Sequence, residues 1–137
     1  MIDFAPGSTH SRGMMNPFLQ VALGGAIGAT ARYATYRALV WHGPDLPVAT
    51  VVVNVAGSLI MGVLAVLLAD RWGTGYAPLL LTGVLGGFTT FSAFSLDALV
   101  LWERGQMTAA AVYVIASVVL SLVAVIAGLA IGRGMLG

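Results

Sequence analysis

The sequence predicts an all-α integral membrane protein with four transmembrane helices, the third of them broken. The 137-residue chain is 59% hydrophobic and 8% charged, with a mean hydropathy of +0.98. A soluble domain of this size does not need so much apolar surface. Four apolar runs follow one another, each at least the ~20 residues that cross a bilayer as a helix. The apolar runs span residues 16–40, 48–69, 76–102 and 107–131. Short joints of turn residues and charged residues separate them.

The first run follows a polar stretch, residues 1–15, which we interpret as a leader or tail of unknown role before a membrane domain at 16–137. Within the run, Gly24 and Gly28 lie four residues apart, a spacing that predicts close contact with another helix. Arg32 lies one step further along the same face. An arginine at this depth costs at least ~2.5 to 3.5 kcal/mol on insertion scales. We therefore expect Arg32 to face a water-filled vestibule or to pair with an acid.

The second and fourth runs each carry polar residues at i, i+4 and i+8, a spacing that places them on one stripe of a helix. These residues are Thr50, Asn54 and Ser58 in the second run and Tyr113, Ser117 and Ser121 in the fourth. Serine and threonine can act as hydrogen-bonding glue between helices, at around 1 kcal/mol each. An amide left unpaired in hydrocarbon costs several kcal/mol. Asn54 therefore needs either a partner helix or a wet pathway.

The third run contains GGFTTFSAFS at residues 86–95, an uncharged segment in which two glycines precede a series of hydroxyls. Such a segment is a poor helix former and predicts an interruption, which membranes tolerate only inside protein or beside water. Phe88, Phe91 and Phe94 recur every three residues and lie on roughly one face. Their ring edges carry partial positive charge, so with hydroxyl and amide donors they would suit a small anion. Packing is the alternative interpretation. Asp97, near the end of this run, is the sole acid within a span.

Composition argues against several classes of function. All six basic residues are arginines spread along the chain, and the net charge of +1 provides no basic patch for nucleic acid. Cysteine is absent, and the two histidines, His10 and His42, have no partner at ligand spacing. We therefore expect no metal enzyme. No nucleophile, base and orienting group occur together at usable spacing, so the sequence predicts no enzyme at all.

The arginines are almost evenly divided between the two sides of a four-helix topology. One side would hold Arg12, Arg71 and Arg133, and the other Arg37 and Arg104, with Arg32 added if it reaches the interface. The bias of arginines between the two sides sets the orientation of a membrane protein. A chain whose arginines are divided so evenly has little reason to prefer one direction. We infer insertion in both orientations and assembly as an antiparallel two-fold dimer. A single orientation, enforced by hydrophobicity differences or an insertion factor, is the alternative.

From residue 16 to residue 133 the chain resembles the Fluc (CrcB) fluoride ion channel family. The resemblance rests on GGAIGA at 24–29 with Arg32 and Tyr33, on TVVVNVAGS at 50–58, and on GGFTTFSAFS at 86–95. It implies a passive, fluoride-selective channel that exports fluoride and lowers its concentration inside the cell. It also implies a multi-pass protein of the inner (plasma) membrane that forms an antiparallel, dual-topology homodimer with two pores.

The resemblance assigns roles to particular residues. It makes Asn54 the pore-lining amide, and Phe91 and Phe94 the rings whose edges contact the ion. The polar track would comprise Ser92, Tyr113 and Ser117, the vestibule would contain Arg32, and the backbone carbonyls of Gly86 and Thr89 would hold a structural sodium ion at the dimer interface. One departure stands out: Ala93 occupies a position where the family usually has threonine, so one hydroxyl of the track is missing.

Two alternatives remain open at this point. A proton-coupled multidrug exporter of the small four-helix kind needs a titratable acid deep in a span, and the first run here has none. Asp97 lies near the end of its run, so that interpretation depends on a poorly placed carboxylate. A non-transporting membrane subunit, in which the polar groups are only helix glue, is the second alternative. Nothing in composition or spacing by itself separates fluoride from chloride.

Overall fold

The computed structural model describes residues 14–39 and 47–137, which form helices and short connections without a strand. The predicted leader therefore lies almost entirely outside the described residues. The elements, in chain order, are α1 (Pro17–Leu39), α2 (Val48–Leu67), the π-helical η2 (Leu68–Trp72), the 3₁₀-helical η3 (Thr74–Tyr76), the π-helical η4 (Pro78–Leu85), α3 (Gly86–Phe88), α4 (Phe91–Glu103) and α5 (Met107–Gly134).

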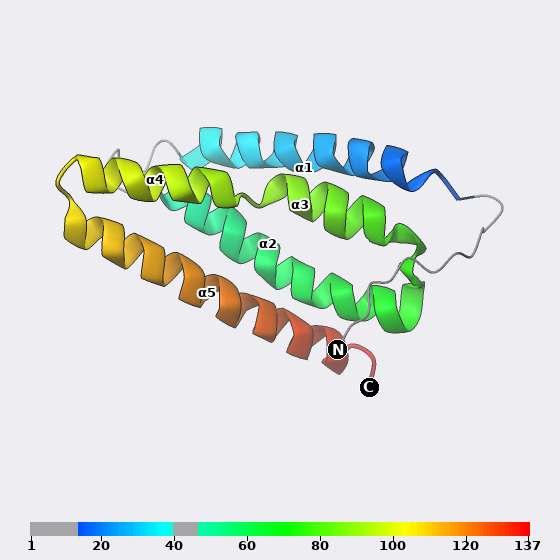
Figure 1. Cartoon of the computed structure of the whole chain (residues 1–137). Helices are drawn as coiled ribbons and strands as arrows, with labels where there is room; N and C mark the ends of the chain where they lie inside the picture. Colours follow the sequence, from blue (N-terminus) through cyan, green and yellow to red (C-terminus); the bar gives the residue numbers. More distant parts are fainter. Residues whose placement is uncertain (1–13, 40–46) are drawn as a thin grey trace.

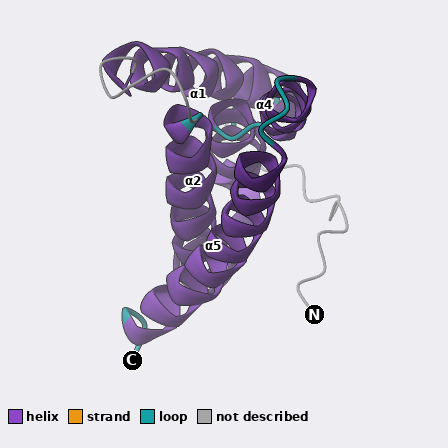
Figure 2. Ribbon diagram, turned by 90° about the vertical axis from the view of Figure 1, so that its left-hand side faces the viewer, coloured by secondary structure: helices purple, strands orange, loops and turns teal. Residues whose placement is uncertain are grey.

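The long helices alternate in direction along the chain and pack as two pairs. In Figure 1, α1 lies beside the segment formed by η4 and α3, whereas α2 lies beside α5. Figure 2 shows α1 running across the direction of α2 and α5, so the two pairs cross. The segment from η4 to α4 connects the two pairs, since η4 and α3 contact α1 whereas α4 contacts α5. The middle of this third helical segment therefore contacts helices of both pairs, while Phe91 at the start of α4 stays 77% exposed.

Three helical segments are long and apolar enough to cross a membrane: Val48–Trp72, Thr74–Glu103 and Met107–Gly134. The first predicted span, α1, has 23 residues and so a length of about 35 Å, sufficient for a bilayer. Gln20, Arg32 and Arg37 make it less apolar than the other three. The architecture is that of an all-helical membrane protein, with three spans established by length and hydropathy.

Glycines bring the paired helices into backbone contact, as the spacing of Gly24 and Gly28 predicts. A Cβ atom at Gly28 would overlap the carbonyl oxygen of Val84 on η4, and one at Gly24 would also strike backbone. In the second pair, a Cβ atom at Gly128 on α5 would overlap the carbonyl oxygen of Leu59 on α2. Without a hydrophobic force between helices in lipid, such close packing is a main source of association.

The third helical segment is broken, as predicted, but at the threonines and not at the glycines. Thr89 (φ −78°, ψ 157°) and Thr90 (φ −153°, ψ 118°) are extended, and α4 starts directly after them. The Thr90 hydroxyl caps α4 by accepting from the backbone N–H of Ala93 at 3.1 Å. Gly87 remains helical, and its missing side chain lets α1 approach, since a Cβ there would lie 2.8 Å from the carbonyl oxygen of Gly25.

Candidate ion pathway at the helix break

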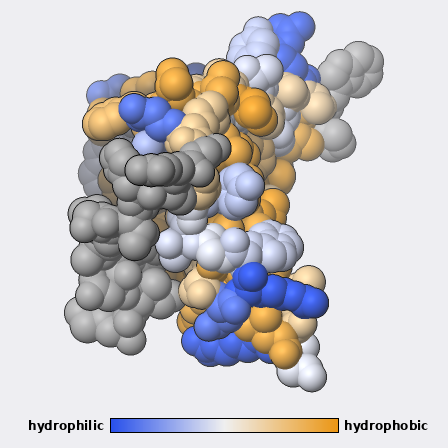
Figure 3. All heavy atoms as spheres, turned by 90° about the vertical axis from the view of Figure 1, so that its right-hand side faces the viewer, coloured by the Kyte–Doolittle hydropathy of each residue, from blue (hydrophilic) through white to orange (hydrophobic). Residues whose placement is uncertain are grey.

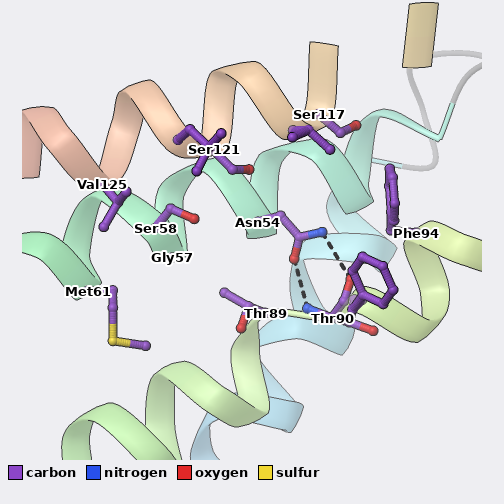
Figure 4. A pocket seen from close by; sticks show the side chains of 13 residues that line it. Asn54, Gly57, Ser58, Met61, Thr89, Thr90, Phe94, Ser117, Ser121 and Val125 are labelled. Carbon is purple, nitrogen blue, oxygen red and sulfur yellow. Dashed lines mark hydrogen bonds between the residues drawn. The ribbon is translucent and has the colours of Figure 1, made fainter. Parts of the chain in front are cut away.

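A groove of about 400 Å³ lies against the break and is formed by α2, α4, α5 and the two extended threonines. Figure 4 shows the side chains of α2 and α5 facing the break across this groove. Most of its lining is apolar, including Met61, Val125 and the phenylalanine rings. Its polar residues are Asn54, Ser58, Thr89, Thr90, Ser117 and Ser121. All six lie on the polar helical stripes or in the GGFTTFSAFS segment that the sequence analysis identifies.

Asn54 forms two hydrogen bonds with the backbone of the break. Its Nδ2 donates to the Thr90 carbonyl oxygen at 3.0 Å, and its Oδ1 accepts from the Thr90 N–H at 2.7 Å (Figure 4). In a continuous helix this N–H would donate to the carbonyl of Gly86, four residues earlier. The amide therefore takes the place of a helical backbone partner and leaves the Gly86 carbonyl without its usual donor. This arrangement satisfies the sequence expectation that Asn54 needs a partner.

Arg32 binds the other side of the break. Its Nη1 donates to the Thr89 carbonyl oxygen at 3.1 Å, and its side chain is half-buried between α1 and the break. A cation at this place also complements the negative C-terminal end of the η4–α3 helix. The sequence offered a vestibule or an acid as the partner of Arg32, and the bond found is to a backbone carbonyl.

Phe91 and Phe94 lie together at the edge of the groove. Their ring centroids are 5.4 Å apart with an interplanar angle of 44°. Phe94 is 9% exposed and also packs on Tyr113, at a centroid distance of 5.5 Å. Phe91, in contrast, is 77% exposed. The structure thus brings both predicted rings to one place and leaves one of them open on this chain.

The predicted polar track divides between the groove and its surroundings. Ser117 lines the groove, is 4% exposed, and its Oγ has no hydrogen-bond partner in the described part of the chain. Ser92 lies on the exposed side of α4, with its Oγ 3.2 Å from the Thr90 hydroxyl. Tyr113 is buried behind Phe94, next to the groove but not in its lining. Ser117 is therefore the donor most available to a ligand.

Sequence reasoning missed a hydrogen-bonded cluster around Asp97. The Asp97 Oδ2 accepts from Thr50 Oγ1 at 2.6 Å and from the Tyr113 hydroxyl at 3.0 Å. The Tyr36 hydroxyl lies 3.0 Å from Thr50 Oγ1. One signal in the sequence could have revealed it. The first residues of the two polar stripes, Thr50 and Tyr113, carry hydroxyls and lie at the same end of the bundle as Asp97. Asp97 is thus held by hydroxyls, whereas Arg32 is held at the break.

The carbonyls expected to hold sodium lie at the break, and their chemistry fits such an ion. Gly86 is exposed, and its carbonyl has lost its helical donor to Asn54. The Thr89 carbonyl accepts from Arg32 at 3.1 Å. Backbone carbonyl oxygens are suitable ligands for an alkali cation in a membrane protein. The arginine on one of the two carbonyls is a competing positive charge.

Comparison with known proteins places these features in a family. The family model described as "CrcB-like protein, Camphor Resistance (CrcB)" matches residues 19–129. The chain belongs to the CrcB family. The matched residues include every predicted site residue, from Arg32 on α1 to Ser117 on α5.

Three curated relatives of this CrcB chain share the name fluoride-specific ion channel FluC. The protein from Paracoccus denitrificans is 59% identical over 122 residues, which cover 89% of this chain and 98% of the relative. That from Cereibacter sphaeroides is also 59% identical over 122 residues, covering 88% and 98% of the two chains. The protein from Rhizobium etli is 52% identical over 125 residues, covering 89% and 99%. The likeness thus extends over nearly the whole of each protein.

Proposed function

We propose that this CrcB protein is a passive, fluoride-selective ion channel that exports fluoride and lowers its concentration inside the cell. The observation that carries the proposal is identity of 59% over nearly the full length of proteins named as fluoride-specific channels. The groove at the helix break is the site where we expect the ion to pass. Its position beside the helix break, where α2, α4 and α5 meet, supports that assignment.

The residues around the groove can replace part of an anion's hydration shell. Asn54 has two amide hydrogens on Nδ2 and uses one of them on Thr90, which leaves one for a ligand. Ser117 has a buried hydroxyl with no partner among the described residues. Phe91 and Phe94 provide ring edges of partial positive charge. Because a bare anion in a medium of low dielectric costs tens of kcal/mol, such donors are a requirement for passage.

The start of α4 adds a favourable dipole. This 13-residue helix begins at Phe91 and its N-terminal end faces the break. Backbone N–H groups at such an end are unpaired and carry partial positive charge, which favours anions. Only one of them, the N–H of Ala93, is used by the capping hydroxyl of Thr90. Fluoride, being small, would gain most from donors held at short range.

We further propose the antiparallel, dual-topology homodimer in the inner (plasma) membrane that the sequence predicts. Among the described residues, the two ends of the helical bundle carry equal charge when the half-buried Arg32 is left out. Each end has two arginines and one acid. These are Asp70, Arg71 and Arg133 at one end, and Arg37, Glu103 and Arg104 at the other. Figure 3 faces the first of these ends and shows hydrophilic residues beside strongly hydrophobic ones. Such symmetry supports insertion in both directions.

A second copy would also cover the open side of the site. Phe91 and Leu122 line the groove and are 77% and 57% exposed on the single chain. A partner seated there would enclose the ring edges and exclude lipid from the path. The sodium ion proposed at the carbonyls of Gly86 and Thr89 would supply positive charge between two such chains. The surrounding lipid contacts the remaining apolar faces.

The test is fluoride efflux from liposomes that contain the purified protein, with a potassium ionophore to clamp the membrane voltage. Chloride efflux is measured in parallel, for the wild type and for Phe91→Ile. Fluoride efflux without chloride efflux, lowered in the variant, is the expected result, because isoleucine keeps bulk but has no ring edge. Absence of fluoride efflux from the wild type would contradict the proposal and favour a non-transporting subunit.

A further inference from the structure

A glycine on α2 makes room for the side chain of Thr89, the first extended residue of the break. Gly57 is buried, and a Cβ atom at this position would overlap Cγ2 of Thr89 and lie 3.4 Å from the ring of Phe88. Figure 4 shows Gly57 and Thr89 opposite each other, where α2 faces the break. The missing side chain of Gly57 therefore leaves a hole in the surface of α2, which the threonine methyl group fills.

The methyl group cannot leave this hole by rotation of the Thr89 side chain without the loss of a hydrogen bond. Thr89 Oγ1 donates to the Leu85 carbonyl oxygen at 2.9 Å, and the Thr89 N–H donates to the same oxygen at 2.9 Å. Oγ1 and Cγ2 are attached to the same Cβ atom, so a rotation that moves Cγ2 also moves Oγ1 away from Leu85. The Thr89 carbonyl in turn accepts from Arg32. Thr89 is thus held at its side chain and at both of its backbone polar groups.

Gly57 lies beside Asn54 on α2. The two residues are three apart in the sequence, and residues at this spacing are neighbours on the surface of a helix. Asn54 binds the backbone N–H and carbonyl of Thr90, while Gly57 receives the side chain of Thr89. One turn of α2 therefore contacts two successive residues of the break, the first by fit of shape and the second by hydrogen bonds.

We propose that Gly57 is a positioning residue of the ion pathway, whose missing side chain sets how closely the break approaches Asn54. The inference rests on the proposed function. An added methyl group at Gly57 would have to separate α2 from the break by about 1 Å to restore ordinary contact between carbon atoms. Asn54 Nδ2 lies 3.0 Å from the Thr90 carbonyl oxygen, so a shift of this size takes it beyond hydrogen-bonding distance. The amide and the start of α4 would then lose the alignment with which they face a permeating anion.

A glycine that only allows close packing of helices would behave differently. Its replacement by alanine lowers the stability of the protein but leaves the transport rate of the folded protein unchanged. Gly132 on α5 is a residue of this kind, because a Cβ atom there would lie 2.9 Å from Cβ of Val66 on α2, and because it does not line the groove. Gly132→Ala is therefore the matched control for Gly57→Ala.

The test uses Gly57→Ala, Thr89→Ser and the double variant, each in the full chain. Thermal midpoints are measured in detergent, and fluoride efflux is measured well below those midpoints, from liposomes with equal amounts of monodisperse protein. Gly57→Ala should transport fluoride about tenfold more slowly than the wild type, the effect of about one lost hydrogen bond. Serine at position 89 keeps Oγ1 for Leu85 but lacks Cγ2, so it leaves room for the alanine. The double variant should therefore transport at the rate of Thr89→Ser alone.

Gly132→Ala should have a lower midpoint than the wild type and the same rate of efflux. A folded Gly57→Ala protein that transports at the wild-type rate would overturn the inference. It would equally be overturned if Gly57→Ala slowed transport as much in the Thr89→Ser background as in the wild type.

The double variant also decides the matter if Gly57→Ala alone does not fold. Recovery of folding and of fluoride efflux in the double variant supports the fit between Gly57 and Thr89, whereas a double variant that stays unfolded although Thr89→Ser folds contradicts it. A wild type without fluoride efflux would instead defeat the proposed function, so the two failures are distinguishable.

Discussion

At the residue scale, Asn54 is the side chain on which the geometry of the break depends most. It both donates to and accepts from the backbone of Thr90, and so replaces bonds that a continuous helix would make. Amide and carboxylate side chains are nearly equal in size but differ in donors, since a carboxylate is acceptor-only. This difference allows the hydrogen bonds to be tested apart from packing.

We expect Asn54→Asp to lower the stability of the protein by about 1 to 3 kcal/mol, the cost of leaving a buried partner unsatisfied. The aspartate oxygen would face the Thr90 carbonyl without a proton to share. The measurement is the midpoint of thermal unfolding in detergent, followed by size-exclusion chromatography. Ser58→Ala, one turn further along α2, serves as the control. Equal midpoints for Asn54→Asp and the wild type would show that these two hydrogen bonds contribute little.

Ala93 gives a second prediction at this scale. Its methyl group is half-buried on α4, in the position where the family resemblance places a hydroxyl. We expect Ala93→Thr to change the rate of fluoride efflux by roughly the effect of one hydrogen bond, up to about tenfold, without a change in selectivity. Parallel fluoride and chloride efflux from liposomes measures both quantities. Loss of discrimination against chloride in this variant would mean that the assignment of the track is wrong.

At the element scale, helix periodicity predicted most of what was found. The four helical runs, the close approach at Gly24 and Gly28, and a break within residues 86–95 all follow from local sequence. The exact position of the break does not, because Thr90 is stabilised by Asn54, which lies 36 residues earlier. Local propensity favours the glycines as the weak point. The long-range hydrogen bonds of Asn54 and the helix cap formed by Thr90 instead place the break at the threonines.

The partners of the charged groups could not be predicted for a related reason. Periodicity gives the face of a helix on which a residue lies, but not how that helix is rotated and shifted against its neighbours. Spacing alone therefore does not tell whether Arg32 and Asp97 meet. In the structure Arg32 meets the Thr89 carbonyl, and Asp97 meets two hydroxyls. These partners belong to other segments of the chain, and spacing within one helix does not predict contacts between segments.

Contact between α1 and the third helical segment is open to a matched glycine test. A Cβ at Gly28 would overlap the backbone of Val84, whereas a Cβ at Gly25 would meet nothing within 4 Å. We expect Gly28→Ala to destabilise by about 1 to 3 kcal/mol, because backbone must move to make room. Gly25→Ala should be neutral or slightly stabilising, since alanine favours helix. Thermal unfolding in detergent of the two variants provides the comparison, and equal midpoints would contradict the close packing.

At the scale of the whole molecule, the balance of charge between the two ends predicts a mixed population in the membrane. The chain has no cysteine, so one introduced at the C-terminal Gly137 is a unique label. In intact spheroplasts, about half of the Gly137→Cys protein should react with a membrane-impermeant maleimide, as expected when arginine bias is absent. Labelling of all or none of it would establish a single orientation and contradict the dual-topology proposal.

The tethering of the break has a consequence for the manner of transport. Thr89 is bound by Arg32 from α1, Thr90 is bound by Asn54 from α2, and the Thr90 hydroxyl caps α4. Rocking of the two halves of the third helix against each other would break these hydrogen bonds to α1 and α2, at a cost of about 1 kcal/mol for each bond lost. A carrier that exposes its site alternately to either side needs such rocking. The tethered break therefore favours a passage whose backbone keeps these hydrogen bonds while the ion moves past it.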